Sequence, residues 1–384
     1  MKLAIINLTG GGMSGGHKSY IANILPRLAA SDKIEKILCA SPVGFKAETW
    51  IAPSPKLSLT VCEPFKLTRS APDKQLKAAL DAFRPDVVFV SIERHFSYPA
   101  APIVTIVHNM APLVNIKTTS GIREKFQSWA RRFETGRAAR GAAAVIAPTT
   151  FVREVLVAGL GVENEKVSLI NFGQSPVPTP VPPADKITDL LKGGFIFTAG
   201  SFEIYRGFED LFRAFADIKG RYPGLKLVIA GGSRPATCGY RTSMETLAAS
   251  LGLSSDLIWP GHISQQELGW YYSHCAAFAL TSRVESFCFV ALEALAHGCN
   301  CIATESPCLP EILADASLYY QAGDSKGLGA GLLEILSRDK GAREQASLKA
   351  AERAARFSWD KAAAETMDLF LKVSGKLSIV NRKS

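Results

Sequence analysis

Apolar and amphipathic segments alternate along nearly the whole chain. Short apolar runs typical of buried strands recur in both halves, separated by longer segments with helical character. These runs are residues 3–8, 37–40, 87–91, 103–108 and 143–147, then 195–199, 226–230, 257–259, 277–280 and 301–303. Strands that alternate with helices favour parallel sheets with helices on both faces. The pattern therefore predicts an α/β protein with two such sheets.

A proline-rich segment separates the two halves. Residues 176–183 read Pro-Val-Pro-Thr-Pro-Val-Pro-Pro, a stiff extended sequence that fits neither sheet. A chain of 384 residues with 47% hydrophobic residues can form two domains, each with its own core. We therefore predict a first domain over 1–175, a hinge over 176–185 and a second domain over 186–358.

Composition narrows the class of protein. The apolar runs fall far short of the roughly 18 residues of a membrane-spanning helix, and the apolar start at 3–6 is too short for a signal peptide. We therefore expect the protein in the cytoplasm. The eight cysteines show no paired framework, so reduced thiols are expected and no metal site is predicted.

The net charge of +9 is concentrated in one predicted helix. Within residues 123–140, Phe126, Trp129 and Phe133 are interleaved with basic residues, namely Arg123, Lys125, Arg131, Arg132, Arg137 and Arg140. A basic amphipathic helix of this kind predicts peripheral contact with an anionic membrane. A solvated helix whose aromatic side chains enter the core fits the same pattern. Nucleic-acid binding is not expected, because no reader motif accompanies the basic residues.

Residues 280–298 contain the most informative polar side chains. Ser286 is a good N-cap for an apolar helix that ends at Gly298, and the free N–H groups at its start would suit a phosphate. Glu285 precedes this helix and Glu293 lies on its second turn, where a buried acid needs donors such as sugar or ribose hydroxyls. The combination points to a nucleotide sugar, although two solvated helix charges would give the same spacing.

The flanking sequence favours a binding site. Apolar strands are predicted immediately before these glutamates, at 276–280, and after them, at 300–304. Both carboxylates therefore fall at the carboxyl end of a parallel sheet, where open α/β sheets bind their ligands.

The two glutamates are separated by seven residues, and this block resembles the donor-site signature of the retaining glycosyltransferases with the GT-B fold, the large group 1 or family 4. Other similar segments follow in the family's order, at 195–200 with 206–208, 225–231, 260–263 and 357–360. The resemblance implies two facing Rossmann-like domains with parallel sheets and a catalytic cleft between them. It also implies a C-terminal helix over 359–384 that crosses back to the first domain.

The resemblance also implies roles for particular residues. Glu285 would bind the sugar hydroxyls, and His108, at the end of a predicted strand, would lie against the transferred sugar. Glu293 would bind the ribose. The donor diphosphate would be bound by Arg206 and by the backbone N–H groups of Phe287 and Cys288. Contacts to the nucleotide base are expected near Gly231, His262 and Ile263.

The glycine-rich segment 10–16 follows the first predicted strand and permits close approach of backbone to a ligand. It matches the dinucleotide pattern G-x-G-x-x-G, but no acid follows the second strand to bind a ribose, which argues against NAD. It also matches the nucleophile elbow around Ser14, for which no partner acid or histidine stands out. The resemblance implies instead that Gly15 and Gly16 face the donor phosphates.

The predicted function is retaining transfer of a hexose from a nucleotide-diphosphate sugar to a glycan or lipid-linked acceptor. Cell-surface polysaccharide, lipopolysaccharide or glycolipid assembly is the expected setting, with no metal or other cofactor. Two alternatives remain at this point. A nucleotide-sugar epimerase shares the fold. A binding protein without turnover is suggested by Ser201, where the family usually has an arginine, and by Cys288, where it usually has a glycine.

Overall fold

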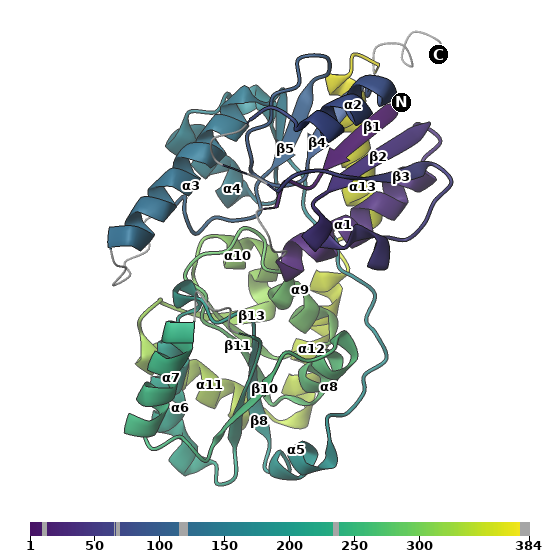
Figure 1. The fold of residues 1–384 in the computed structure, drawn as a ribbon. Coiled ribbons are helices and arrows are strands. Elements are labelled where there is room, and N and C mark those ends of the chain that lie inside the picture. The colour runs from purple at the N-terminus through teal and green to yellow at the C-terminus, as the bar shows by residue number, and fades with distance from the viewer. Residues whose placement is uncertain (10–13, 65, 67–69, 115–121, 233–237, 377–384) are drawn as a thin grey trace. The chain divides into compact units, whose positions relative to one another are not determined.

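The computed structural model describes residues 1–9, 14–64, 66, 70–114, 122–232 and 238–376. The chain divides into two compact units. The first contains the described residues up to Gly173 together with those from Ser358 onward, and the second contains the described residues of Gln174–Phe357. Figure 1 colours the first unit mainly purple to blue and the second mainly teal to green.

The first unit is built on a parallel sheet of seven strands in the order β3-β2-β1-β4-β5-β6-β7. The central strands are completely buried, which explains their uninterrupted apolar sequences. The strands are β1 Lys2–Ile6, β2 Lys36–Ser41, β3 Leu57–Val61, β4 Val87–Val90, β5 Ile103–Ile106, β6 Ala144–Ala147 and β7 Val167–Leu169. Because β1 pairs with both β2 and β4, the strand order reverses beside it, which creates the switch point where such sheets bind ligands.

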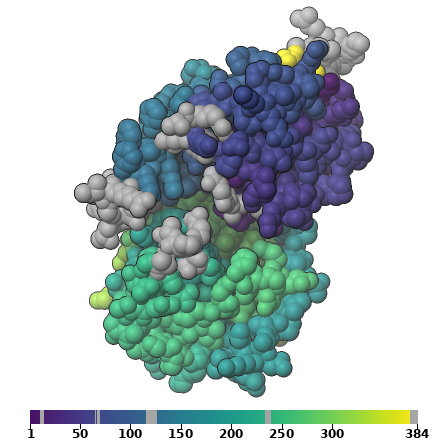
Figure 2. Space-filling model, in the orientation of Figure 1, coloured from purple at the N-terminus to yellow at the C-terminus, as the bar shows by residue number. Residues whose placement is uncertain are grey.

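The described residues of this unit form the α-helices α1 Gly15–Ala30, α2 Lys74–Phe83, α3 Ile122–Gly141, α4 Thr150–Glu154 and α13 Trp359–Val373. Helix α13 packs against α1, with ion pairs from Arg27 to Asp360 at 2.6 Å and from Lys33 to Asp368 at 3.3 Å. The yellow α13 accordingly lies among purple and blue elements in Figure 1, and yellow atoms of the C-terminal segment border blue atoms in Figure 2. The predicted return of the C-terminal helix to the first domain is confirmed.

The second unit has a parallel sheet of six strands in the order β10-β9-β8-β11-β12-β13. The strands are β8 Phe195–Ala199, β9 Lys226–Ala230, β10 Leu257–Gly261, β11 Ala277–Leu280, β12 Cys301–Thr304 and β13 Ser317–Tyr320. The helices are α5 Asp185–Leu190, α6 Phe208–Ile218, α7 Cys238–Ser250, α8 Gln265–His274, α9 Phe289–Ala296, α10 Cys308–Leu313, α11 Ser325–Ser337 and α12 Lys340–Ala354. The two α/β units with parallel sheets confirm the predicted fold class.

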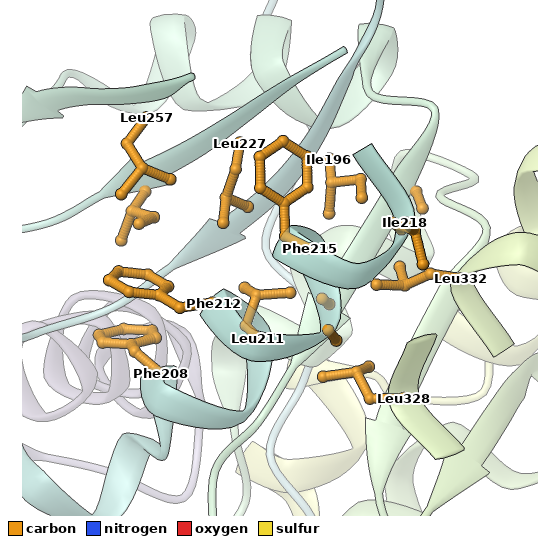
Figure 3. Packing of buried hydrophobic residues seen from close by; sticks show 14 of the residues in the cluster. Ile196, Phe208, Leu211, Phe212, Phe215, Ile218, Leu227, Leu257, Leu328 and Leu332 are labelled. Carbon is orange, nitrogen blue, oxygen red and sulfur yellow. The ribbon is translucent and has the colours of Figure 1, made fainter. Parts of the chain in front are cut away.

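One face of α6 supplies much of the second core. Phe208, Leu211, Phe212 and Phe215 recur at helical spacing and are all essentially buried. Figure 3 shows them pointing toward side chains of β8, β9 and β10, with leucines of α11 on the other side. This packing fixes the start of α6 at the carboxyl edge of the sheet.

All ten predicted strands are present, and their ends differ by at most two residues. The pattern did not predict β3, β7 and β13, which are outermost strands of their sheets. Outermost strands bury less of their surface, and Leu59, Val61 and Leu169 are each 40–42% exposed. These strands therefore lack the continuous apolar run on which the predictions depended.

The proline-rich segment lies with the second unit. The chain enters that unit at Gln174, whose N–H donates to the carbonyl of Phe357 at 3.0 Å, and the units change a few residues before the predicted hinge at 176–185. Within the segment, the N–H of Val181 donates to the carbonyl of Gln266 in α8 at 3.1 Å. The segment is extended, as its prolines require, and is fastened to the unit that follows it.

Helix α3 places its aromatic side chains in solvent. Phe126, Trp129 and Phe133 are 65%, 60% and 55% exposed and stack in sequence, with ring centroids 5.9 and 6.0 Å apart. The alternative in which these side chains enter the core is therefore wrong. In the part of the chain that the structure describes, no helix combines the length and the apolar character needed to cross a membrane.

Candidate functional site

An ion pair lies at the carboxyl edge of the second sheet. Arg206 ends the 3-10 turn Ile204–Arg206 after β8, and Glu285 lies in the loop after β11. The Arg206 Nη1 donates to Glu285 Oε1 at 2.5 Å and to Ser282 Oγ at 3.0 Å. Both charged side chains are only 12% exposed. The structure thus brings together two predicted site residues that are distant in sequence.

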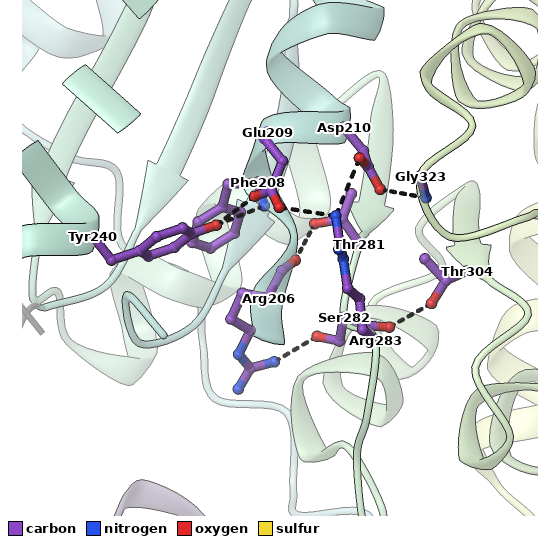
Figure 4. Close-up of polar contacts among 10 residues, drawn as sticks. All are labelled: Arg206, Phe208, Glu209, Asp210, Tyr240, Thr281, Ser282, Arg283, Thr304 and Gly323. Carbon is purple, nitrogen blue, oxygen red and sulfur yellow. Dashed lines mark hydrogen bonds and ion pairs between the residues drawn. The ribbon is translucent and has the colours of Figure 1, made fainter. Parts of the chain in front are cut away.

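Buried hydroxyl groups fix the position of this arginine. Thr281 Oγ1 donates to the Arg206 carbonyl at 2.5 Å, so the backbone and the side chain of Arg206 are both bound by the segment after β11. The carbonyl of Ser282 in turn accepts hydrogen bonds from Thr304 Oγ1 at 2.5 Å and Ser306 Oγ at 2.8 Å. Figure 4 shows the Thr281, Ser282 and Thr304 contacts. No sequence signal indicated this network, because hydroxyl residues at strand ends are common.

A second arginine nearby is committed to structural contacts. Arg283 Nη2 pairs with Glu209 at 2.8 Å and with Asp210 at 3.4 Å, and Asp210 also accepts the N–H of Gly323 at 2.9 Å (Figure 4). The buried Nε atoms of Arg206 and Arg283 both lack a hydrogen-bond partner within the described residues, but only Arg206 pairs with the predicted site residue Glu285. An unpaired buried donor costs about 1–3 kcal/mol, so an acceptor at Arg206 would stabilise the site.

Glycines line the neighbouring strand ends. Gly200, Gly231 and Gly261 follow or end β8, β9 and β10, and all have positive φ, of 146°, 143° and 76°. The N–H of Gly231 donates to the Gly261 carbonyl at 2.8 Å. A Cβ on Gly231 would lie 1.9 Å from the Gly200 carbonyl oxygen, so only glycine fits there. His262 is exposed directly after β10 and Ile263 is half-buried, on the same edge as Gly231.

Helix α9 begins at Phe289, two residues later than an N-cap at Ser286 requires, so that prediction is wrong. The N-cap is Cys288, whose side chain makes no capping bond and whose backbone is left-handed at φ 66° and ψ 73°. This conformation cannot continue a helix, so Phe287 belongs to the preceding loop and is buried. Gly298 ends the helix with φ 70°, as predicted.

Glu293 lies on the second turn of α9, as expected, and is half-buried. Burial raises the pKa of its carboxyl from 4.5 to about 7, and a hydrogen bond from Tyr272 opposes this rise. The Tyr272 hydroxyl donates to Glu293 Oε2 at 3.2 Å. Sequence reasoning missed Tyr272, which comes from α8 and has no fixed spacing from Glu293.

In the first unit, His108 follows β5 at the carboxyl edge of its sheet. Its backbone N–H donates to Oε2 of the buried Glu93 at 2.9 Å. Its ring lies among the rings of His17, Tyr20 and Phe172, with centroids 5.1–5.5 Å away. Burial, together with the neighbouring His17, brings the pKa of His108 well below 6.5. The imidazole is therefore neutral near pH 7.

Buried polar groups join three strand ends beside His108. His17 Nε2 lies 3.0 Å from Ser91 Oγ, which donates to Asn7 Oδ1 at 2.5 Å, and Asn7 Nδ2 donates to Ser41 Oγ at 2.8 Å. Sequence reasoning did not single out these residues. The available signal was a polar residue at the carboxyl end of each of β1, β2 and β4.

The glycine-rich segment is described only from Ser14 onward, so the part at 10–13 lies outside the described residues. Gly15 and Gly16 are the first residues of α1, and Ser14 is its N-cap, with Oγ accepting the N–H of His17 at 3.2 Å. Gly15 has open space where a Cβ would lie. Among the described residues, no three His, Cys, Asp or Glu side chains are placed to hold a metal ion.

Two unlike halves, each a parallel α/β sheet with polar residues gathered at its carboxyl edge, define a two-domain transferase of the GT-B class. The family model described as glycosyl transferases group 1 matches residues 185–354, and that described as glycosyltransferase family 4 matches residues 14–173. The chain belongs to the group 1 glycosyltransferases and is a glycosyltransferase.

The similarity to known proteins extends over nearly the full length of this chain. A D-inositol 3-phosphate glycosyltransferase of Streptomyces bingchenggensis is 27% identical, and the match covers 94% of this chain and 85% of the relative. The structure of HepE from Anabaena, solved with UDP and glucose, has a TM-score of 0.74 at 16% identity and covers 97% of this chain and 100% of its own. WaaG, a glycosyltransferase involved in lipopolysaccharide biosynthesis, has a TM-score of 0.73 at 15% identity, with 96% and 99% covered.

Proposed function

We propose that the protein transfers a hexose, with retention of anomeric configuration, from a nucleotide-diphosphate sugar to a glycan or lipid-linked acceptor. The observation that carries this proposal is the half-buried Arg206–Glu285 pair, with Glu293 on the adjacent helix. A cation and two carboxylates suit a diphosphate, a sugar and a ribose. The Anabaena HepE structure contains UDP and glucose, which supports a ligand of this class.

In this proposal each group has a separate task. Arg206 neutralises charge on the departing diphosphate, and its unpartnered Nε supplies one donor. Glu285 orients Arg206 and accepts hydrogen bonds from sugar hydroxyls, while Glu293 accepts those of the ribose. Neutral His108 offers a ring N–H to the sugar. Same-face attack, with the departing phosphate oxygen removing the proton of the acceptor hydroxyl, gives retention without an enzyme nucleophile.

The test is donor binding followed by product analysis. UDP and other nucleoside diphosphates are titrated against the protein, and one of them should raise the melting temperature, with about 2.7 kcal/mol of stabilisation at 100 times its dissociation constant. Arg206→Ala should abolish that shift. Arg343→Ala, in the same unit and distant in sequence, is the control, because Arg343 binds only backbone carbonyls of Arg338 and Leu336. No shift with any nucleotide would refute the donor site.

Product analysis then separates the alternatives. With the matching nucleotide sugar and a glycan acceptor, nuclear magnetic resonance should show a new glycosidic bond with the donor's anomeric configuration. Conversion of the donor without an acceptor would instead identify an epimerase. Tight binding with no turnover of any donor would identify a binding protein, the alternative that Ser201 and Cys288 suggest in the sequence.

We also propose that α3 rests on an anionic membrane surface, where a lipid-linked acceptor would be found. Phe126, Trp129 and Phe133 occupy positions i, i+3 and i+7 and therefore share one side of the helix. Tryptophan and phenylalanine favour the headgroup region, and the basic residues of α3 are attracted to anionic lipid. A second copy of the chain would bring the same positive charge, which disfavours self-association through this face.

The helix is anchored so that the aromatic side stays exposed. Arg132 donates to the carbonyls of Leu113 and Gly159, and Arg140 donates to the Leu160 carbonyl at 2.7 Å. Vesicles of phosphatidylglycerol and phosphatidylcholine should therefore co-sediment the protein, with less binding at high salt. Replacing the three aromatic residues by serine should abolish co-sedimentation. Leu348→Ser is the control, because Leu348 is equally exposed, at 66%, but lies in the second unit. Equal binding of both variants would refute this interface.

A further inference from the structure

Two cysteines of the second unit lie on neighbouring strand approaches. Cys275 follows α8 and leads into β11, and Cys299 follows α9 and leads into β12. The strands β11 and β12 are parallel neighbours in which Phe278 pairs with Cys301, and the Phe278 N–H donates to the Asn300 carbonyl at 2.9 Å. Extending this register places Cys275 and Cys299 one residue out of step, so their Cα atoms lie roughly 6 Å apart. Disulfides span Cα separations of about 4.4–6.8 Å.

The two side chains already point at each other. Cys275 Sγ lies 3.9 Å from Cys299 Sγ, and both thiols donate to the same acceptor, the Tyr272 carbonyl, at 3.4 and 3.1 Å. A third thiol, Cys301, donates to the Cys299 carbonyl at 3.3 Å. A bond between Cys275 and Cys299 therefore requires only that the two sulfur atoms move closer together. The pairing of β11 with β12 does not have to change.

Access distinguishes the two thiols. Cys275 is partly exposed, whereas Cys299 is buried. Burial, reinforced by the adjacent Cys275 thiol, raises the pKa of Cys299 well above its ordinary value, which disfavours direct attack of Cys299 on an oxidant. An oxidant from solvent therefore reaches Cys275 first.

We propose that Cys275 and Cys299 form a reversible disulfide when the protein meets a peroxide. The Cys275 thiolate attacks one peroxide oxygen and becomes a sulfenic acid, and hydroxide leaves. The Cys299 sulfur then attacks the Cys275 sulfur, the S–O bond breaks, and water is released with the Cys299 proton. Overall, two thiols and one hydrogen peroxide give one disulfide and two waters. A dithiol reductant reverses the reaction.

The disulfide has a consequence for Tyr272. Its carbonyl loses both S–H donors when the sulfurs bond, while its hydroxyl donates to Glu293 at 3.2 Å. Tyr272 also contacts the His297 ring, with centroids 5.1 Å apart, and His297 lies at the end of α9. Oxidation therefore shifts the residue that supports the carboxylate assigned to the ribose, and donor binding weakens. This step, unlike the disulfide itself, rests on the proposed function.

Peptide mapping tests the bond. The full-length protein is treated with stoichiometric hydrogen peroxide, the remaining thiols are alkylated, and the digest is analysed by mass spectrometry. A peptide pair joined through Cys275 and Cys299, two hydrogens lighter than the free peptides, is expected. Cys275→Ser and Cys299→Ser should each abolish it, and Cys301→Ser should not. Only sulfinic acid at Cys275, or a bond between Cys299 and Cys301, would overturn the proposal.

Nucleotide binding tests the consequence. Whichever nucleoside diphosphate binds the reduced protein should bind the oxidised protein several-fold more weakly, and dithiothreitol should restore its affinity. Cys275→Ser should bind the nucleotide as tightly as the reduced wild-type protein does, both with and without peroxide. Equal affinity of the mapped disulfide form would overturn the link to Tyr272. If no nucleotide binds even the reduced protein, the proposed function fails while the mapped disulfide stands.

Discussion

Replacing Glu293 by glutamine should stabilise the protein at alkaline pH. Burial raises the pKa of this carboxyl from 4.5 to about 7, so the folded protein binds its proton more tightly than the unfolded chain does. Between these two values the folded state carries more protons than the unfolded state, and stability therefore falls as the pH rises through this window. Glutamine cannot ionise and escapes this loss.

The magnitude follows from the size of the pKa difference. A carboxyl whose pKa rises from 4.5 to about 7 on folding makes the folded protein about 3 kcal/mol less stable when the carboxyl is ionised than when it is protonated. Partial solvent contact of Glu293 makes this an upper value. The glutamine side chain can still accept the Tyr272 hydroxyl, so the main difference between the two proteins is the charge. For a unit of this size each 1 kcal/mol raises the melting temperature by about 2–4 °C.

Thermal denaturation of Glu293→Gln and the wild type at pH 5 and pH 8 measures this effect. The variant should melt several degrees above the wild type at pH 8, and at nearly the same temperature as the wild type at pH 5. Glu344→Gln is the control, because Glu344 is 65% exposed on α12, and it should show no such dependence. A variant no more stable at pH 8, or equally stabilised at both pH values, would refute the reasoning. The same variant should bind the donor nucleotide more weakly, since the charged acceptor is gone.

Three further predictions concern the backbone and the histidine of the candidate site. Cys288→Val should destabilise the protein by about 2 kcal/mol more than Cys288→Gly in urea denaturation, because a β-branched residue tolerates φ 66° poorly; equal loss would contradict the left-handed assignment. Gly231→Ala should abolish soluble expression or binding of the nucleotide, because its Cβ would lie 1.9 Å from the Gly200 oxygen, whereas Gly232→Ala, with open space around it, should be tolerated. Turnover should show no inflection from His108 between pH 6 and 8, since its pKa lies well below 6.5; an inflection near 6.5 that disappears in His108→Asn would count against neutral hydrogen bonding.

The central strands could be predicted because burial on both faces demands continuous apolar sequence. Strand β1, for instance, is buried from Leu3 to Ile6 and has no polar residue there. Strand β3 shows the opposite case, with Leu59 and Val61 partly exposed at the sheet edge and Thr60 between them. Its sequence alternates apolar and polar residues and so lacks the continuous apolar run on which the predictions depended. Pairing with β2 decides its structure, and pairing is not visible in a local pattern.

The candidate site could be predicted residue by residue but not contact by contact. Arg206 was expected at the diphosphate and Glu285 at the sugar hydroxyls, yet nothing in either segment indicated their ion pair at 2.5 Å. The partners Tyr272 and Glu93 were missed for the same reason, because each comes from an element distant in sequence. The two ends of α9 were predicted from neighbouring residues alone. The end at Gly298 was predicted correctly, and the start was wrong.

The error at the start of α9 has a physical cause that also marks the site. Helix propensity and capping favoured a start at Ser286, but the left-handed Cys288 delays it. A strained backbone at Cys288, a buried Arg206 donor without a partner and a carboxyl at Glu293 with a raised pKa all lie at the carboxyl edge of one sheet. Glycine at 288 would relieve the backbone strain, and glutamine at 293 would remove the cost of a buried carboxylate. The concentration of these features in loops and helix starts after β8 and β11, above a core that follows the local rules closely, is what a site selected for binding is expected to show.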